Sequence, residues 1–588
     1  MPTTYKNPVY PYRRPPELDV QGVRHDPVVI VGAGPSGLAA AIDLAQQGIN
    51  SIVLDDNDTV SVGSRALCFA KRSLEIIDRL GCVEPMLEKG VTWQHGRVFF
   101  QDREVYDFNL LPEDGHRIPA FINLQQYYFE EFLVNRAHDF PAQIDLRWQH
   151  KVIDVDAQPE RSVIKVSTQD GDYQLTCDYL LVSDGANSRI RETLGLECKG
   201  QVFQDRFLIA DVVMKADFPT ERWFWFDPPF HPNQSVLLHK EPDNVWRIDF
   251  QLGWDADPEE EKKEENIRPR VQAMLGKDVE FELEWASVYT FRCRKMDNFI
   301  HHNVIFMGDA AHQVSPFGAR GANGALQGVD NLVWKLARVL KAQAPKTLLS
   351  TYNTERQHGA SENILNSTRA TDFITPKSHI SQVFRDATLE LAETNAFART
   401  LVNSGRLSMP CRYDNSPLNT PDIDGGPSEL RPGSPAKDAP IRLVSEDTCE
   451  GICEGTYERA WLLNQFGDGF VLLLDGRSVG SSAEVSAEAL SELLSQYKDL
   501  SAVIIGPTST ALGAQPRTTI VEDPEGLVTE RYGLTAGAGY LIRPDQHVAA
   551  RWHTTTARNV GDALGRALGV HLADTVDTTS EESCHAKA

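Results

Sequence analysis

A glycine-rich turn between an apolar strand and a helix of small residues constrains this fold more than any other feature of the sequence. Residues 28–37 read VVIVGAGPSG and run directly into LAAAIDLAQQG. Gly32 and Gly34 permit a tight turn and a close approach of the backbone to a pyrophosphate, which then lies at the helix N-terminus. A bare G-x-G-x-x-G, completed here by Gly37, is a weak signal. The strand before it and the helix after it strengthen the prediction of an adenine dinucleotide site.

A second strand supports this interpretation. Residues 51–54 read SIVL and are followed by Asp55. This acid lies about 20 residues after the glycine turn, where dinucleotide-binding folds place a carboxylate on the ribose hydroxyls. Asp56 is a neighbouring candidate for the same role, and a solvated turn acid is the simpler alternative.

A further glycine-containing turn follows another strand. Residues 303–312 read NVIFMGDAAH, and a glycine-rich bend beyond Pro316 opens a helix from Gly321. Asp309 can bind a ribityl chain, and the helix start can hold negative charge on a reduced flavin, contributing about 0.3–1 kcal/mol. A purely structural glycine turn is the alternative. We expect flavin contacts at Gly308, Asp309, Gly321, Ala322 and Asn323.

The pattern of apolar and aromatic residues changes along the chain, which predicts several domains. Short apolar strands alternate with helical stretches, then give way to long strands rich in aromatics, as in an antiparallel sheet. A segment dense in Pro, Gly, Asp and Ser is typical of a linker, and a second α/β pattern follows it. We predict an arm at 1–25 that is mobile or lies on a partner, a Rossmann-like domain at 26–205 and 301–411, a sheet domain at 206–300, a linker at 412–430, an α/β domain at 431–575 and a flexible tail at 576–588.

Length and charge exclude several classes of protein. The 588 residues exceed what one core supports, since single cores rarely grow past about 250–300 residues. The 58 Lys and Arg against 83 Asp and Glu give a net charge of −25, which repels phosphate backbones and anionic lipids. We therefore expect no nucleic-acid partner. No apolar run reaches the roughly 18 residues of a membrane helix, so we expect no membrane partner either.

The termini and cysteines indicate a reducing compartment. The N-terminal basic residues are not followed by an apolar run, unlike a secretory signal. The nine cysteines are scattered, which suits the cytoplasm. Cys449 and Cys453 are the closest pair, but they lack the C-x-x-C spacing and a second half, so we expect neither a metal site nor thiol redox chemistry there.

These strings together resemble the FAD-dependent aromatic hydroxylases of the para-hydroxybenzoate hydroxylase type. The resemblance extends over residues 27–572 and includes SRALCFAKRSLEIIDRLG at 64–81, LQQYYFEEFL at 124–133, DGANSR at 184–189 and TYNTERQ at 351–357. The chain is most similar to the phenol hydroxylase and 3-(3-hydroxyphenyl)propionate hydroxylase branch. The resemblance implies a Rossmann-like FAD-binding domain interleaved with an antiparallel-sheet substrate domain, followed by a thioredoxin-like α/β domain (α/β plus α+β).

The same resemblance implies which residues bind the cofactor. It assigns FAD contacts to Gly32, Gly34, Gly37 and Asp55, as the glycine turn predicts. Arg65 and Gln126 would lie on the flavin and pyrophosphate side. Gln125 is the adjacent alternative, and Gln126 fits the family's spacing to Glu130 better. Asp184 would contact both FAD and the transient nicotinamide.

The aromatic-rich strands carry the candidate catalytic residues. In VWRIDFQ at 245–251, Arg247 and Asp249 share a face because strand side chains alternate. The resemblance places Arg247 against the flavin and Asp249 toward the ring, where it could accept a phenolic proton. A structural Arg–Asp pair is the alternative. His239 could share that cavity, whereas the aromatic run at 223–226 favours core packing over substrate stacking.

We predict an NAD(P)H-dependent FAD monooxygenase that hydroxylates a phenolic or other electron-rich aromatic ring. The resemblance implies that NADPH or NADH reduces the flavin, that O₂ forms a C4a-hydroperoxide, and that its terminal oxygen is transferred to the ring. A dry cavity is needed because the hydroperoxide otherwise decays to H₂O₂. Two alternatives stay open: a flavoprotein NAD(P)H oxidase or dehydrogenase without oxygen transfer, and a flavin-bound scaffold of a multi-protein pathway. We expect a homodimer.

Overall fold

The computed structural model divides the chain into two compact units. The first comprises residues 1–112, 118–329 and 360–409, and the second comprises 113–117, 330–359 and 410–588. Cys449, Cys453 and the predicted tail at 576–588 lie outside the described residues, so the expectations about them stay predictions. The structure describes residues 4–216, 218–276, 278–402, 407–426, 428–443, 459–478, 486–506 and 515–572.

The first sheet of unit 1 is built on the predicted glycine-turn strand. β1 (Arg24–Val31) lies between β2 (Ser51–Asp55) and β11 (Gly171–Val182), and both pairings are parallel. Because its Val and Ile residues are buried on both faces, β1 is the apolar run typical of a parallel strand. The order is β17 (Ile300–His301), β18 (Val304–Phe306), β11, β1, β2, β8 (Ile144–Trp148), with β10 (Ser162–Thr168) and β9 (Lys151–Ala157) extending from β11.

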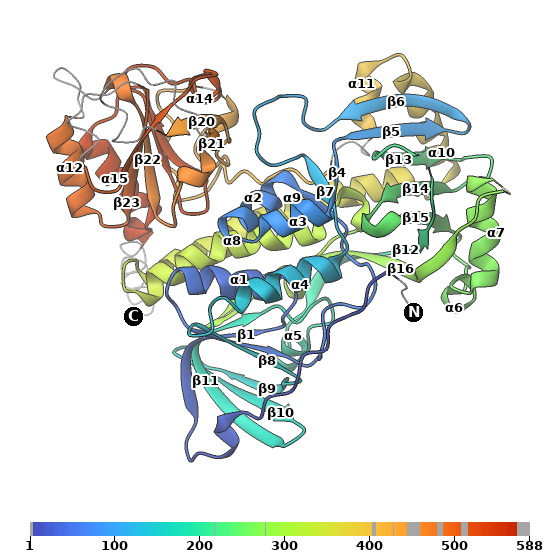
Figure 1. Cartoon of the computed structure of the whole chain (residues 1–588), viewed down its shortest axis with the longest axis horizontal. Helices are drawn as coiled ribbons and strands as arrows, with labels where there is room; N and C mark the ends of the chain where they lie inside the picture. Colours follow the sequence, from blue (N-terminus) through green and yellow to red (C-terminus); the bar gives the residue numbers. More distant parts are fainter. Residues whose placement is uncertain are drawn as a thin grey trace, which may run out of the picture. The chain divides into compact units, whose positions relative to one another are not determined.

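Helices cover this sheet and bring a helix N-terminus to its edge. α1 (Pro35–Gln46) and α4 (Gln126–Ala137) lie together against β1 and β8 in Figure 1. α1 begins just beyond the carboxyl end of β1, which is where doubly wound folds bind ligands. The other helices of unit 1 are α2 (Lys71–Arg79), α3 (Val83–Lys89), α5 (Arg189–Thr193), α6 (Pro258–Glu261), α7 (Glu264–Leu275), α10 (His379–Ala392) and α11 (Ala396–Leu401). Two helices belong to both units: α8 (Gly321–Leu340) begins in unit 1 and ends in unit 2, and α9 (Ser350–Ile374) begins in unit 2 and ends in unit 1.

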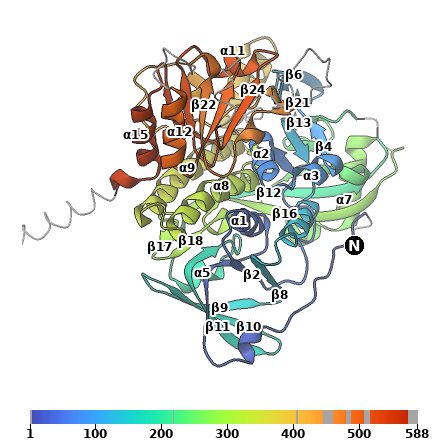
Figure 2. The ribbon, with the colours of Figure 1, turned by 60° about the vertical axis from the view of Figure 1, so that its left-hand side comes forward.

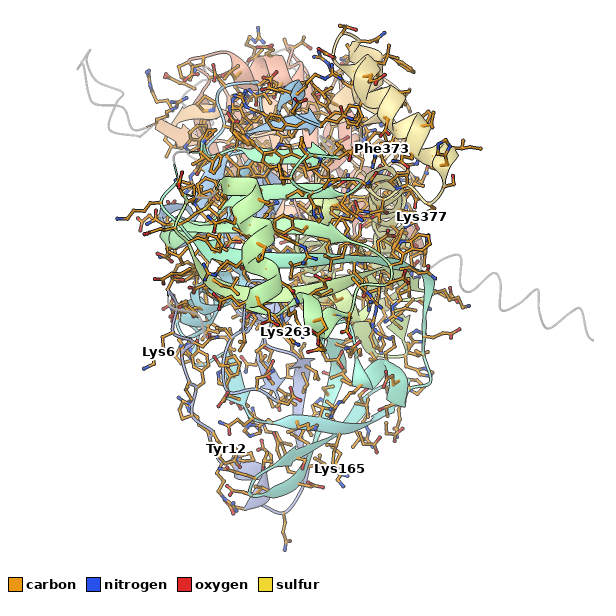
Figure 3. The ribbon with its side chains drawn as sticks, turned by 90° about the vertical axis from the view of Figure 1, so that its right-hand side faces the viewer. Lys6, Tyr12, Lys165, Lys263, Phe373 and Lys377 are labelled. Carbon is orange, nitrogen blue, oxygen red and sulfur yellow. The ribbon has the colours of Figure 1, made fainter. Side chains whose placement is uncertain are left out.

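The second sheet of unit 1 is the long-stranded, aromatic-rich region. One face carries Trp246, Ile248 and Phe250, which pack under α7, and Figure 3 shows this helix lying across the strands above Lys263. β5 and β6 extend the sheet from within residues 26–205, and β5 pairs in parallel with β13. The order is β19 (His312–Gln313), β16 (Glu282–Met296), β12 (Cys198–Val213), β15 (Val245–Leu252), β14 (Ser235–Lys240), β13 (Arg222–Phe226), β5 (His95–Phe100), β6 (Arg103–Asn109).

Aromatic contacts hold the N-terminal arm on its own unit. Tyr5 stacks on Tyr127 with ring centroids 4.1 Å apart, and Tyr10 stacks on Trp148 at 4.5 Å. The arm follows the edge of the unit past Tyr12 in Figure 3. The described part of the arm thus lies against the domain that follows it in sequence, and its mobility or contact with a partner stays a prediction. A small sheet of β3 (Cys68–Ala70), β7 (Phe121–Asn123) and β4 (Val91–Trp93) completes unit 1.

Unit 2 is a mixed sheet between two helical layers (Figure 2). α12 (Ala487–Gln496) and α15 (Ala557–Ala567) bury leucines and alanines against one face. α14 (Leu527–Tyr532) covers the other through Val528 and Tyr532. The strand order is β21 (Arg459–Trp461), β20 (Pro440–Leu443), β24 (Thr518–Glu522), β23 (Leu500–Ile505), β22 (Phe470–Asp475), β25 (Gly539–Ile542), β26 (Val548–Trp552).

The predicted fold class is confirmed at the level of its architecture. A mostly parallel α/β sheet and a mostly antiparallel sheet share unit 1, and an α/β unit follows. The thioredoxin-like resemblance of unit 2 stays a prediction. Among the helices that the structure describes, none combines the length and apolar content of a membrane span.

Candidate active site

One cavity of about 950 Å³ in unit 1 brings the predicted residues together. Its walls come from the carboxyl edge of the first sheet, the N-terminus of α8 and one face of the second sheet. Gly37 and Gly308 support the turns behind the wall. The predicted residues that line the cavity are Gly32, Gly34, Asp55, Arg65, Gln126, Asp184, His239, Arg247, Asp249, Asp309, Gly321, Ala322 and Asn323.

The glycine turn leaves a cradle that side chains would close. Gly32 has φ +103°, and a Cβ there would lie 2.4 Å from the Ser183 carbonyl oxygen. A Cβ on Gly37 would lie 1.9 Å from the Gly32 carbonyl oxygen, so the turn itself needs that glycine. At Gly34 the nearest atom to an added Cβ is a Glu130 oxygen at 3.9 Å, and the space belongs to the cavity. Gly34 therefore keeps room for a ligand rather than for the chain.

Asp55 occupies the predicted position at the end of β2. One of its oxygens accepts a hydrogen bond from the Ala33 N–H at 2.6 Å, and the other accepts from the Asn57 N–H at 2.9 Å. Burial raises the pKa of this carboxyl, while these donors counteract the rise. Asp56 also lines the cavity, so both candidates for the ribose contact stay at the site.

Gln126 anchors the loop between β2 and β3. Its side-chain oxygen accepts from the Ala66 N–H at 3.0 Å, and its amide donates to Glu130 at 2.7 Å. Glu130 in turn accepts from the Ser61 N–H at 2.6 Å. Gln125 is fully buried outside the cavity wall. The structure thus favours Gln126 over Gln125 for a contact beside Arg65.

Two acidic groups that line the cavity, Asp184 and Asp309, follow the neighbouring strands β11 and β18. Asp184 accepts from the Ile190 N–H through one oxygen, while its other oxygen is buried without a hydrogen-bond partner among the described residues. Asp309 follows β18, and burial raises its pKa to about 6, with Arg65 opposing the rise. Buried polar atoms normally find partners. The orphaned Asp184 oxygen, the Asp309 carboxyl in the cavity lining and the open cradle at Gly34 fit the hydroxyls and N–H groups of FAD.

The start of α8 closes the flavin side of the cavity. Gly321 and Ala322 form its first turn, with backbone N–H groups free of the helix ladder, as at any helix start. The Asn323 side chain is already used, because it accepts from the Ala70 N–H at 2.8 Å and donates to the Cys68 carbonyl at 2.9 Å. A ligand contact at Asn323 would therefore come from its backbone.

The face of the second sheet that borders the cavity carries two rows of side chains. Strand register places Leu237, Asp249, Ile209 and Ser287 in one row, and His239, Arg247, Asp211 and Trp285 in the next. Arg247 and Asp249 share this face, as the alternation predicts. The aromatic run 223–226 packs in the flanking cores, which confirms the core interpretation of that strand.

Arg247 is fully engaged by its neighbours. Its guanidinium donates to Asp211 at 3.0 and 3.2 Å, to the Ser64 carbonyl at 2.5 Å and to the Arg65 carbonyl at 3.2 Å. Glu241 lies 3.3 Å from it, although neither Glu241 oxygen makes a hydrogen bond with the described residues. Burial, with Asp211 beside it, raises the pKa of Glu241 well above its ordinary value. Arg247 thus ties the sheet to the segment that carries Arg65.

Asp249 is a carboxyl poised near neutrality. Burial raises its pKa to about 6, with Arg247 opposing the rise. One of its oxygens is buried without a hydrogen-bond partner in the described chain. An acid of this pKa can accept a proton near neutral pH.

His239 lies beside the same row. Burial, followed by Arg222 and Arg247, lowers its pKa well below the ordinary value, so the ring is neutral. Its Nδ1 lies 3.9 Å from the Cys68 thiol sulfur.

Sequence reasoning missed several cavity residues. Arg222, Asp211, Glu241 and Glu130 are all buried at or beside the site. Arg222 directly precedes the aromatic run, so alternation could have placed it on one face with Phe224 and Phe226. Asp211 and Glu241 come from separate strands, and only the register brings them to Arg247.

Comparison with known proteins identifies relatives over most of the chain. Residues 25–367 match the FAD binding domain family. The chain is 27% identical over 551 residues to 6-methylpretetramide 4-monooxygenase of Streptomyces rimosus, covering 91% of this chain and 92% of the relative. It is 26% identical to a probable NADH-specific resorcinol 4-hydroxylase of Rhodococcus jostii, covering 89% and 91%. It is 28% identical to the 3-(3-hydroxy-phenyl)propionate/3-hydroxycinnamic acid hydroxylase of Burkholderia cenocepacia, covering 62% and 67%.

Solved structures share the fold. The flavin-dependent monooxygenase PieE, in complex with FAD and substrate, matches with a TM-score of 0.75 at 20% identity, covering 92% of this chain and 99% of that one. Aklavinone-11 hydroxylase, with FAD and aklavinone, matches with a TM-score of 0.72 at 20% identity, covering 93% and 100%.

Proposed function

This chain belongs to the FAD binding domain family, and from that premise we propose that it is an NAD(P)H-dependent FAD monooxygenase of phenolic or other electron-rich aromatic rings. The resemblance to FAD-dependent aromatic hydroxylases, stated from the sequence strings, is confirmed by the relatives. Their names are those of monooxygenases and hydroxylases, which supports oxygen transfer over the oxidase, dehydrogenase and scaffold alternatives.

One observation carries the proposal. A single cavity joins the dinucleotide turn to the charged face of the second sheet, so a flavin and a ring substrate can share one enclosed space. The fingerprint end supplies backbone N–H groups and glycine clearance for FAD. The sheet end supplies Asp249 within an apolar wall that includes Phe207, Ile209 and Leu237.

Each residue then has a role. FAD, when bound, would carry electrons from NAD(P)H to O₂ and so activate O₂, which is the source of the oxygen atom transferred to the ring. Gly32, Gly34, Asp55, Gln126, Asp184 and Asp309 hold it, with Arg65 beside it. Asp249 accepts the phenolic proton, which raises the electron density of the ring. Arg247 is a positioning residue, because its hydrogen bonds fix the Ser64–Arg65 segment. Neutral His239 lines the same end.

The apolar walls have a chemical purpose. Phe207, Ile209, Leu237 and Phe317 offer no hydrogen bonds to water and surround the space where the ring would lie. Excluding water from that space suppresses the side reaction that releases H₂O₂. The predicted division into an FAD-binding part, a substrate sheet and a C-terminal domain remains part of this proposal.

The surface of α10 and α11 supports a homodimer. Ile380 is 81% exposed, Phe384 58% and Phe397 68%. These exposed apolar side chains lie on two helices that contact each other, and large exposed apolar patches on soluble proteins mark interaction sites. We place the dimer interface on this face and the enzyme in the cytoplasm, where NAD(P)H is available. Phe384→Glu should convert the dimer to a monomer in light scattering, and a dimer that persists would move the interface elsewhere.

The test of the proposal uses the purified protein. FAD should bind without a covalent link, and Gly34→Val should abolish that binding without unfolding the chain, because the added side chain enters only the cavity. With NAD(P)H, ¹⁸O₂ and a panel of phenols, one ¹⁸O atom should appear in the product. NAD(P)H consumption without labelled product, across the panel, would favour the oxidase instead.

A further inference from the structure

A buried arginine at the substrate end of the cavity has no hydrogen-bond or ion-pair partner among the residues that the structure describes. Arg222 is the first residue of β13 and is 5% exposed. Its Nε is buried without a hydrogen-bond partner, and in the described part of the chain its guanidinium joins no ion pair. Its side chain lines the cavity together with Cys68, His239 and Asp249. Arg222 thus presents an unused cation to the space where a ring would lie.

The neighbouring arginine shows what a satisfied site looks like. Arg247 donates hydrogen bonds to Asp211 and to two backbone carbonyls. Arg222 has an acid nearby, Asp249, but the two do not reach ion-pair distance. Neighbouring strands lie about 4.8 Å apart, and β14 separates β13 from β15, so the two backbones are about 10 Å apart. Both side chains line the cavity, so a ligand there can contact both of them.

An unpaired buried charge is unfavourable by several kcal/mol in typical proteins, so such a group persists where a ligand compensates it. Among the described residues, the acids near Arg222 other than Asp249 are engaged elsewhere. Glu241 and Asp211 lie at Arg247, and Glu221, next in sequence, pairs with Arg97 at 2.6 Å. His239 is neutral and cannot compensate the charge. The missing anion must come with what binds in the cavity.

We propose that Arg222 binds an anionic oxygen of the aromatic substrate. This inference rests on the proposed function for the identity of the ring, and adds that the ring carries an acidic oxygen when bound. The oxygen has two possible sources. One is the phenolate left when the phenol O–H bond breaks and its proton moves to Asp249, the electron pair staying on the ring oxygen. The other is a carboxylate elsewhere on the substrate.

Binding measurements on the FAD holoenzyme test the proposal without turnover. The probes are two matched pairs, 4-nitrophenol with 4-nitroanisole, and 3-(3-hydroxyphenyl)propionate with its amide. Binding is followed by the change in flavin absorbance. A hydrogen bond to a charged group changes affinity by about 10–100-fold. The wild type should prefer the anionic member of at least one pair by that factor, and Arg222→Gln should remove the preference.

The control is Arg97→Gln. Arg97 lies on β5 beside β13, but its guanidinium pairs with Glu221 and Glu104 outside the cavity. This variant should keep the preference. Arg222→Lys keeps the charge and should retain part of it, which guards against a misfolded glutamine variant. Loss confined to the nitrophenol pair identifies the phenolate, and loss confined to the propionate pair identifies the carboxylate.

Two results would overturn the proposal: a wild type without preference in either pair, or an Arg222→Gln holoenzyme that keeps it. Failure of the proposed function is distinguishable, since it would appear as absent ¹⁸O product while the binding preference remains.

Discussion

Two clusters of buried charged side chains, one in each unit, differ in how completely their polar atoms are paired. In unit 2, Glu355 accepts from Lys335 at 2.6 Å and from Arg543 at 2.7 and 3.1 Å. Asp545 accepts from Arg543 at 2.9 Å, and Asn331 and Ser416 add further hydrogen bonds. Every charged atom of this unit 2 cluster has a partner.

The sheet cluster of unit 1, made of Arg222, Arg247, Asp211, Glu241 and Asp249, is incomplete. Both Glu241 oxygens, one Asp249 oxygen and the Arg222 Nε have no hydrogen-bond partner among the described residues. Burial alone is the same in both places, so it does not separate structure from function. The unpaired polar atoms distinguish a functional cluster from a structural one, because a fully hydrogen-bonded network stabilises one conformation, whereas an incomplete network needs a ligand to complete it.

Asp249→Asn should give the largest effect. If Asp249 is the general base, hydroxylation should fall by about 10²–10⁴-fold, or roughly 3–5 kcal/mol of barrier. FAD binding and reduction by NAD(P)H should persist, with H₂O₂ released in place of product. The measurement is product formed per NAD(P)H consumed.

The stability of the same variant sharpens the comparison. Because Asp249 lacks a full set of partners, its neutral replacement should not lower the free energy of unfolding. If Asp249→Asn hydroxylates at the wild-type rate, Asp249 is a structural acid and His239 becomes the next candidate base.

Arg543→Met tests the satisfied cluster. Removing Arg543 leaves Lys335 as the one cation paired with Glu355 and takes the arginine from Asp545, so one buried negative charge is uncompensated, which costs about 3–5 kcal/mol. We expect urea unfolding of unit 2 to shift by that amount. Arg459→Gln is the control, since its pair with Glu525 is exposed on both sides and such pairs contribute about 0–1 kcal/mol. Equal effects of the two variants would mean that the buried cluster adds nothing to stability.

The two clusters should also respond differently to pH. Burial raises the pKa of Asp249 to about 6, and the base must be ionised. The kcat/KM for hydroxylation should therefore fall below pH 6 by about tenfold per unit, equivalent to about 1.4 kcal/mol. In Asp249→Asn this inflection should vanish. An inflection that survives would belong to Asp309, whose pKa burial also raises to about 6.

The pKa of Glu355 is shifted in the opposite direction from that of Asp249. Burial alone would raise its pKa, but Arg543 and Lys335 lower it below the ordinary value. Its contribution to stability is thus fully present above the ordinary pKa of a glutamate and is lost only as the pH falls below it. Unfolding of unit 2 should not change between pH 5 and pH 7, the range over which hydroxylation varies; these bounds follow from a glutamate pKa of about 4.3.

The same contrast explains what the sequence could predict. The residues of the flavin end lie in short continuous sequence motifs, so Gly32, Asp55 and Asp309 could be placed from their neighbours in sequence alone. The sheet end depends on register. Arg247 and Asp249 were found because they share one strand, whereas Arg222 and Asp211 reach the cavity from other strands.

The unit 2 cluster is even harder to predict from the sequence, because its residues are far apart along the chain. Glu355 and Arg543 are separated by 188 positions, and no local pattern marks either residue. The expectation that Cys449 and Cys453 carry out no thiol redox chemistry stays a prediction, because both lie outside the described residues.

Lys335→Met should give the smallest effect and tests whether all members of a satisfied cluster matter equally. Burial lowers the pKa of Lys335 to about 8, although Glu355 opposes this. The cost of desolvating the lysine charge therefore exceeds its favourable interaction with Glu355. Without Lys335, Glu355 keeps both hydrogen bonds from Arg543. The loss should therefore approach that of a single hydrogen bond, about 0.5–1.5 kcal/mol, well below that of Arg543→Met. Urea unfolding of the two variants side by side gives the comparison. A Lys335→Met variant as unstable as Arg543→Met would mean that the four charges act as one unit, and that Arg543 alone cannot hold Glu355.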